Sequence, residues 1–82
     1  MNTAAKLLSA MRRNPSDWSM PNVLRLARHH GLEVRNNGGS HCVFSHPLLA
    51  VHLTIPARRP IKSLYIKRLV TLIDQLQTSS SS

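Results

Sequence analysis

The chain has 82 residues, enough for one small domain and too few for two independent hydrophobic cores. Eleven lysines and arginines against three acidic residues give a formal net charge of +8. This charge favours a polyanionic partner such as a nucleic acid, or an acidic protein that masks it. No apolar run approaches the roughly 18 residues of a membrane span, there is no signal-peptide pattern, and the single Cys42 has no partner for an internal disulfide. We therefore expect a cytoplasmic protein without membrane contact.

The first expected element is a short helix that runs from Thr3, a suitable N-cap, to Arg13. Its apolar residues recur at helical spacing at Ala4, Leu7, Leu8 and Met11. The segment 14–17, Asn-Pro-Ser-Asp, ends it. Trp18 follows in a connector, where we expect it to pack this helix onto the rest of the chain. Residues 1–17 are therefore interpreted as an added helix and connector, and residues 18–77 as the main domain.

A second helix is expected from about residue 19 or 20 to residue 30. Ser19 can cap it, Pro21 is tolerated in its first turn, and Gly31 can close its C-terminus. Its expected apolar side consists of Val23, Ala27 and His30, flanked by Leu24 and Leu26.

Three short strands follow. Residues 32–36 alternate between apolar and polar side chains, and the Asn-Asn-Gly-Gly run at 36–39 predicts a hairpin turn. The second strand covers residues 40–45, with Cys42 and Phe44 inward and His41 and Val43 outward. The third is predicted over residues 50–55, before Pro56. Its inward residues are expected to be Val51, Leu53 and Ile55, and its outward residues His52 and Thr54.

The last helix is predicted over residues 62–77, with residues 78–82 as a disordered tail that has nothing to bury. Its expected core stripe is Tyr65, Ile66, Leu69, Leu72, Ile73 and Leu76. The whole pattern predicts an α+β fold in which a three-stranded antiparallel sheet carries two helices on one face, with an extra N-terminal helix. The other face of the sheet stays open, and it carries Arg35, His41, Val43, His52 and Thr54.

Several motifs occur in an order that resembles a known family. The helix over 23–30 leads into Gly31-Leu32-Glu33-Val34-Arg35, and the run Gly39-Ser40-His41-Cys42-Val43-Phe44-Ser45-His46-Pro47 follows. The run Leu53-Thr54-Ile55-Pro56-Ala57-Arg58-Arg59-Pro60-Ile61-Lys62 then precedes the closing helix. In these features, which cover about residues 18–76, the chain resembles the HicA toxins, small bacterial ribonucleases of toxin–antitoxin pairs.

The resemblance implies an α-β-β-β-α fold like that of double-stranded-RNA-binding domains. It also implies a toxin that cuts mRNA as a metal-independent endoribonuclease without a cofactor, that is a monomer when free, and that a HicB-type antitoxin neutralises. The motif histidine of the family corresponds to His41. The chain departs from many members after the Thr-Ile-Pro sequence, where it has Ala57 in place of a histidine.

His41 has suitable chemistry for RNA cleavage because an exposed imidazole titrates near pH 6.5 and can serve as acid or base. His52 and Ser40 are auxiliary candidates, since a hairpin pairing would place His52 diagonal to His41. The alternative for His41 is a structural cap that hydrogen-bonds a turn carbonyl. A zinc site is not expected, because Cys42 points to the face opposite His41, and a buried thiol there would be inert as a nucleophile.

The basic side chains are candidate contacts to the RNA backbone, with plain solubility as the alternative. The candidate RNA-binding residues are Arg35, Arg58, Arg59, Lys62, Lys67 and Arg68. The main alternative to a ribonuclease is an RNA-binding module of the same fold that does no chemistry. A DNA-binding regulator is a weaker alternative, because no helix-turn-helix spacing is present.

Overall fold

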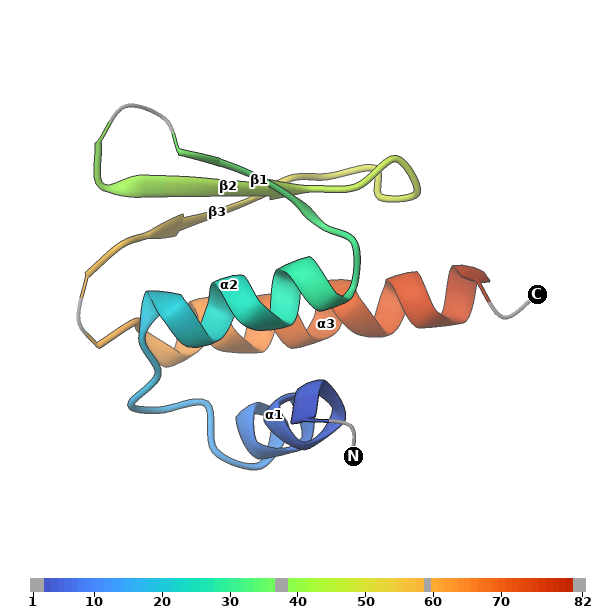
Figure 1. Ribbon diagram of the computed structural model, residues 1–82. Helices are drawn as coiled ribbons and strands as arrows, with labels where there is room; N and C mark the ends of the chain where they lie inside the picture. Colours follow the sequence, from blue (N-terminus) through green and yellow to red (C-terminus); the bar gives the residue numbers. More distant parts are fainter. Residues whose placement is uncertain (1–2, 37–38, 59, 81–82) are drawn as a thin grey trace.

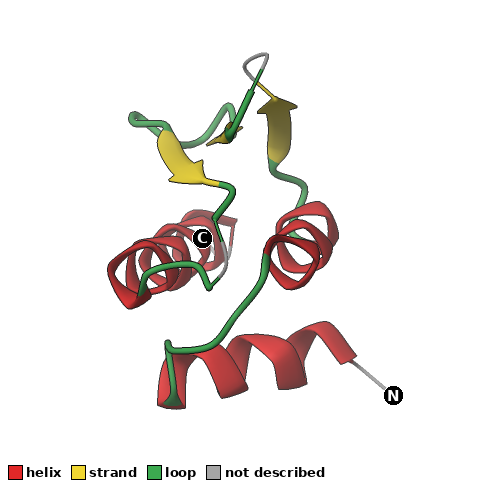
Figure 2. Cartoon of the chain, turned by 90° about the vertical axis from the view of Figure 1, so that its left-hand side faces the viewer, coloured by secondary structure: helices red, strands yellow, loops and turns green. Residues whose placement is uncertain are grey.

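The computed structural model describes residues 3–36, 39–58 and 60–80, and its elements follow the order α-α-β-β-β-α (Figure 1). The three strands form one antiparallel sheet in the order β1-β2-β3. α2 and α3 run side by side along one face of this sheet, and α1 crosses beneath them (Figure 1, Figure 2). The predicted α+β fold, including two helices on one sheet face and an added N-terminal helix, is confirmed.

The added helix α1, Thr3–Arg13, shares the hydrophobic core of the domain. Ala4, Leu8 and Met11 are buried, and Met11 is only 1% exposed. At the solvent edge, the Arg12 guanidinium donates two hydrogen bonds to the Asp74 carboxylate of α3, each 2.7 Å long. This contact lowers the pKa of Asp74 and raises that of Arg12. The helix is therefore attached both by its apolar side and by an ion pair.

Trp18 connects α1 to the main domain, as the sequence predicted. Its side chain is half-buried against the core, and its indole Nε1 donates a 2.6 Å hydrogen bond to the Asn14 carbonyl. Its own carbonyl accepts a 2.9 Å hydrogen bond from Ile61 N, far along the chain. The connector thus fixes the segment that precedes α3.

α2, Met20–His29, begins at a residue expected from its sequence and ends one residue before the predicted end at His30. The Asn22 side chain reaches back to Ser19, accepting hydrogen bonds from Ser19 N at 3.2 Å and Ser19 Oγ at 2.9 Å. Gly31 follows the helix at φ +75°, a left-handed conformation that suits glycine. One detail of the prediction is wrong, because Leu26 is fully buried rather than flanking.

The first two strands are β1, Glu33–Asn36, and β2, His41–Ser45. β2 is the central strand, and its alternation is clear, since Cys42 and Phe44 are buried whereas His41 is exposed and Val43 half-buried. Arg35 pairs with Val43, and Val43 pairs on its other side with Thr54. The predicted turn residues Asn37 and Gly38 lie outside the described residues.

The third strand, β3, covers Leu53–Pro56 and is shorter at its start than predicted. Residues 50–52 belong to the connection from β2, and Val51, which was expected to point inward, is 60% exposed. The alternation of apolar and polar residues begins before the strand, at Val51, but of its apolar residues only Leu53 and Ile55 are buried in the core. A period of two alone does not show where strand pairing stops.

α3, Ser63–Ser80, extends beyond the predicted end. Its stripe of Ile66, Leu69, Leu72, Ile73 and Leu76 is buried as expected, together with Val70. The disordered tail predicted from residue 78 is wrong for residues 78–80, which are helical. The Thr78 hydroxyl donates a 3.0 Å hydrogen bond to the Asp74 carbonyl, and no proline or glycine interrupts the helix at this point.

Candidate active site

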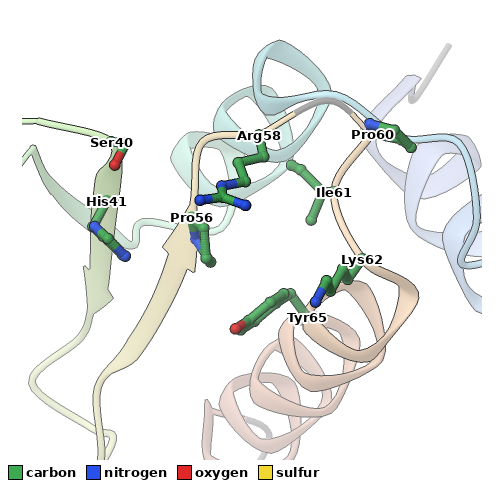
Figure 3. A pocket seen from close by; sticks show the side chains of 8 residues that line it. All are labelled: Ser40, His41, Pro56, Arg58, Pro60, Ile61, Lys62 and Tyr65. Carbon is green, nitrogen blue, oxygen red and sulfur yellow. The ribbon is translucent and has the colours of Figure 1, made fainter.

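A pocket with a volume of about 330 Å³ lies where one end of the sheet meets the start of α3 (Figure 3). Strands β2 and β3 form one side, and residues 58 and 60–62 together with the first turn of α3 form the other. Its lining residues are Ser40, His41, Pro56, Arg58, Pro60, Ile61, Lys62 and Tyr65. Four of the predicted site residues therefore meet in one place: His41, Ser40, Arg58 and Lys62.

The backbone around His41 is held by the sheet. His41 is the first residue of β2 and pairs with Pro56 of β3. One residue further out, the Ser40 carbonyl accepts a hydrogen bond from Ala57 N, which extends the pairing beyond the strand. On the other side, Gly39 N donates a 3.2 Å hydrogen bond to the Asn36 side chain. The imidazole thus projects from a fixed backbone.

The loop opposite His41 is tied down at both ends. The backbone N–H of Ala57 donates a hydrogen bond to the Ser40 carbonyl. The backbone N–H of Ile61, a residue that is only 2% exposed, donates one to the Trp18 carbonyl. Between and just after these anchors, Arg58 and Lys62 are exposed to solvent and extend into the pocket (Figure 3). Arg58 therefore directly follows one anchored residue, and Lys62 directly follows the other.

Tyr65 is the pocket residue that the sequence did not reveal. It was expected to belong to the core stripe of the last helix, and it does pack partly against the core. It is nevertheless only half-buried, and its hydroxyl end points into the pocket (Figure 3). The sequence signal for this position is that Tyr65 lies in the first turn of α3, three residues after Lys62. A residue at the start of a helix lies at the edge of the core, where its polar end can reach solvent.

The pocket is electrostatically suited to an anion. No acidic side chain lies among the described residues that line it, whereas Arg58, Lys62 and His41 do. In the described part of the chain, these three side chains make no hydrogen bond or ion pair. The N-terminus of α3 also lies at the pocket, and its dipole adds partial positive charge. A phosphate group is the biological anion that such a set of donors fits best.

The structural alternative for His41 finds no support within the described residues. The His41 ring makes no hydrogen bond to a described residue, and the turn residues Asn37 and Gly38 lie outside the described part of the chain. The ring is exposed and available to a ligand. Cys42 is buried on the opposite face of β2, as predicted.

His52 does not lie beside His41, and its predicted position diagonal to that residue is wrong. The register pairs His41 with Pro56, so the residue diagonal to it on β3 is Thr54. His52 precedes β3 at its other end, about 13 Å along the chain at the usual rise per residue. The prediction assumed a shorter connection between the strands, whereas residues 46–52 all lie outside them.

The remaining basic candidates lie on other surfaces. Lys67 and Arg68 line a second groove between α3 and the start of β3, together with His52. Arg35 is exposed on the open face of the sheet, paired with the residue two positions along β2 from His41. Arg59 lies outside the described residues. The predicted RNA-binding set is thus divided between the pocket, the sheet face and this groove.

Comparisons with models of known protein families, with curated proteins and with solved structures find no match to this chain. Within the described residues, no helix combines the length and apolar character that crossing a membrane requires.

Proposed function

We propose that the chain is a ribonuclease toxin of the HicA type, a metal-independent endoribonuclease that cleaves mRNA. The observation that carries the proposal is the meeting of His41, Arg58 and Lys62 in one open pocket that no acidic described residue lines. Strand β2 and the 57–62 loop are far apart in the sequence, so their chemical side chains meet only through the fold. The resemblance to HicA toxins, which names His41, is independent support.

The reaction is transesterification at a phosphodiester bond. The scissile phosphate binds between Arg58 and Lys62, whose charges stabilise the extra negative charge of the phosphorane. Neutral His41 accepts the proton of the ribose 2′-OH, and the 2′-oxygen attacks phosphorus. The bond to the 5′-oxygen of the next nucleotide breaks, which leaves a 2′,3′-cyclic phosphate and a 5′-hydroxyl end. DNA lacks the attacking hydroxyl and is not cut.

Binding and chemistry occupy different surfaces in this proposal. The RNA backbone extends from the pocket toward Arg35 on the sheet face and toward Lys67 and Arg68 in the second groove. These contacts are to phosphates, so they add affinity without reading sequence. His52, beside Lys67 and Arg68, adds at most a phosphate contact, and Ser40 borders the scissile phosphate.

The proposed setting is the bacterial cytoplasm, where a HicB-type antitoxin holds the toxin inactive and the free toxin is a monomer. The support is the charge of +8 together with a pocket that lies open to solvent. An acidic antitoxin that covers His41 and the segment from Arg58 to Arg68 would mask both. Hydrogen exchange of the complex should then slow at both places, and unchanged exchange at His41 would contradict this mode of inhibition.

The test of the function compares the wild-type chain with two variants, each of which has one histidine replaced by alanine. Inducing the wild-type chain should stop growth and degrade mRNA, His41→Ala should do neither, and His52→Ala should still do both, since it loses at most one phosphate contact. Both histidines are exposed, so both variants should fold. Equal growth arrest by wild type and His41→Ala would contradict the role of His41.

The alternative of a non-catalytic RNA-binding module has a specific observation in its favour, which is that Lys67 and Arg68 line a groove away from the pocket. Such a module would bind RNA saturably and leave it intact in wild type and His41→Ala alike. The same two proteins therefore distinguish the two functions.

A further inference from the structure

We propose that the Tyr65 hydroxyl is the second proton-transfer group of the site, and that it protonates the 5′-oxygen as the RNA chain breaks. This inference rests on the proposed ribonuclease function. It names a catalytic residue for the step that His41 does not perform.

The need for a second group follows from the reaction. His41 takes the 2′-OH proton and is then an imidazolium on the side of the attacking oxygen. In an in-line displacement the leaving oxygen departs from the opposite side of phosphorus, out of reach of a proton donor placed at the attacking oxygen. An alkoxide is a poor leaving group, so a donor on the far side speeds the step by about 10²- to 10⁴-fold.

The other pocket groups are less suited to this role. A guanidinium is not deprotonated in proteins, which excludes Arg58. The Ser40 hydroxyl is too weakly acidic, and it lies next to His41 on the same side of the pocket. Lys62 would lose its charge by donating a proton, at the moment when the phosphorane needs it. A phenol carries its proton at neutral pH and is far more acidic than an alcohol.

The geometry places Tyr65 across the pocket from His41. His41 extends from β2, whereas Tyr65 extends from the first turn of α3, and both polar ends point into the same opening (Figure 3). The inner part of Tyr65 packs against the core, and its backbone N donates a 3.0 Å hydrogen bond to the Lys62 carbonyl. The hydroxyl makes no hydrogen bond within the described residues, so it is available to substrate.

The step balances as follows. The Tyr65 O–H bond breaks, its proton joins the departing 5′-oxygen, and a phenolate remains. Arg58 and Lys62 line the same pocket and offset this negative charge. After product release, imidazolium His41 returns its proton to the phenolate through solvent. The site is then restored, with no net change in protons.

The experiment compares an ordinary RNA with one that needs no general acid. The second RNA has sulfur in place of the 5′-oxygen at a bond that the wild type is known to cut, because a thiolate leaves without protonation. Tyr65→Phe keeps the ring and its packing and removes only the hydroxyl. It should cut ordinary RNA about 100-fold more slowly than wild type and cut the sulfur RNA within about threefold of the wild-type rate.

Two controls make the result specific. Lys62→Ala should be slow on both RNAs, since the charge of the phosphorane must be offset in either case, and His41→Ala should also be slow on both. Equal rates of Tyr65→Phe and wild type on ordinary RNA would overturn the inference, and so would an equal slowing on both RNAs. A wild type that cuts neither RNA would instead overturn the proposed function.

Discussion

His41 lies opposite Pro56, and this pair is the last one between β2 and β3. Proline has no N–H, so it cannot donate to the sheet ladder, and the chain leaves the strand at this point. The next hydrogen bond, from Ala57 to the Ser40 carbonyl, starts the loop that brings Arg58 and Lys62 to face the imidazole. The end of the sheet therefore determines where the pocket opens.

Lys62 and Lys67 should fail in different ways when each is replaced by alanine. Both are exposed cations near the start of α3, but only Lys62 lines the pocket. Lys67→Ala should weaken RNA binding and reduce the slope of log affinity against log salt by about one, while the cleavage rate of bound RNA stays unchanged. Lys62→Ala should lower that rate as well. Affinity across a salt series and single-turnover cleavage measure the two effects, and equal cleavage rates in both variants would contradict the division.

His30 should make the fold less stable in mild acid. Burial lowers the pKa of this histidine, the nearby charge of His29 lowers it further, and its buried Nε2 has no partner among the described residues. Above about pH 6.5 the ring is neutral in both the folded and the unfolded chain, so it has no effect on stability there. As the pH falls below that value the unfolded chain takes up a proton more readily than the folded one, and stability is lost until the pH passes the folded pKa.

Urea denaturation at pH 7.5 and pH 5.5 measures this effect. The denaturation midpoint of the wild type should be lower at pH 5.5 than at pH 7.5, and this decrease should be smaller for His30→Leu. His52→Ala, which removes an exposed histidine, should show the same decrease in midpoint as the wild type. A fall in His30→Leu equal to that of the wild type would place the acid sensitivity elsewhere.

Trp18 should contribute more to stability than a half-buried side chain that only packs, because its indole also donates a hydrogen bond to the Asn14 carbonyl. Trp18→Ala should lower the free energy of unfolding by about 2–3 kcal/mol, below the range for a fully buried tryptophan. Trp18→Phe keeps most of the ring but loses the indole donor, and should cost about 1 kcal/mol. Denaturant titration measures both, and equal losses would show that the indole hydrogen bond, not the packing, carries the effect.

Much of this fold could be predicted because local signals agree with the tertiary packing. The Ser19 start and Gly31 end of α2, the alternation of β2 and the stripe of α3 each specify both an element and its inner face. The outward position of His41 on β2 could be predicted from the alternation of that strand. These signals depend only on neighbouring residues.

Two of the errors depend on strand register. Val51 and His52 continue an alternating pattern, but pairing starts only at Leu53, so neither has the predicted position. Tyr65 fits an apolar stripe, and apart from its place in the first turn of α3 the sequence does not show that the stripe meets a pocket there. The pairing of distant segments, such as Trp18 with Ile61, likewise has no local signature.

The most direct test of the central claim is cleavage by the purified protein of one RNA in two forms, with chelator present. The substrate is all-RNA or carries a single 2′-deoxynucleotide at the bond cut in the first form. The wild type should cut the all-RNA form to leave 2′,3′-cyclic phosphate and 5′-hydroxyl ends, and should leave the substituted bond intact. His41→Ala should bind both forms and cut neither. Cleavage at the deoxy-substituted bond, or undiminished cutting by His41→Ala, would contradict the account.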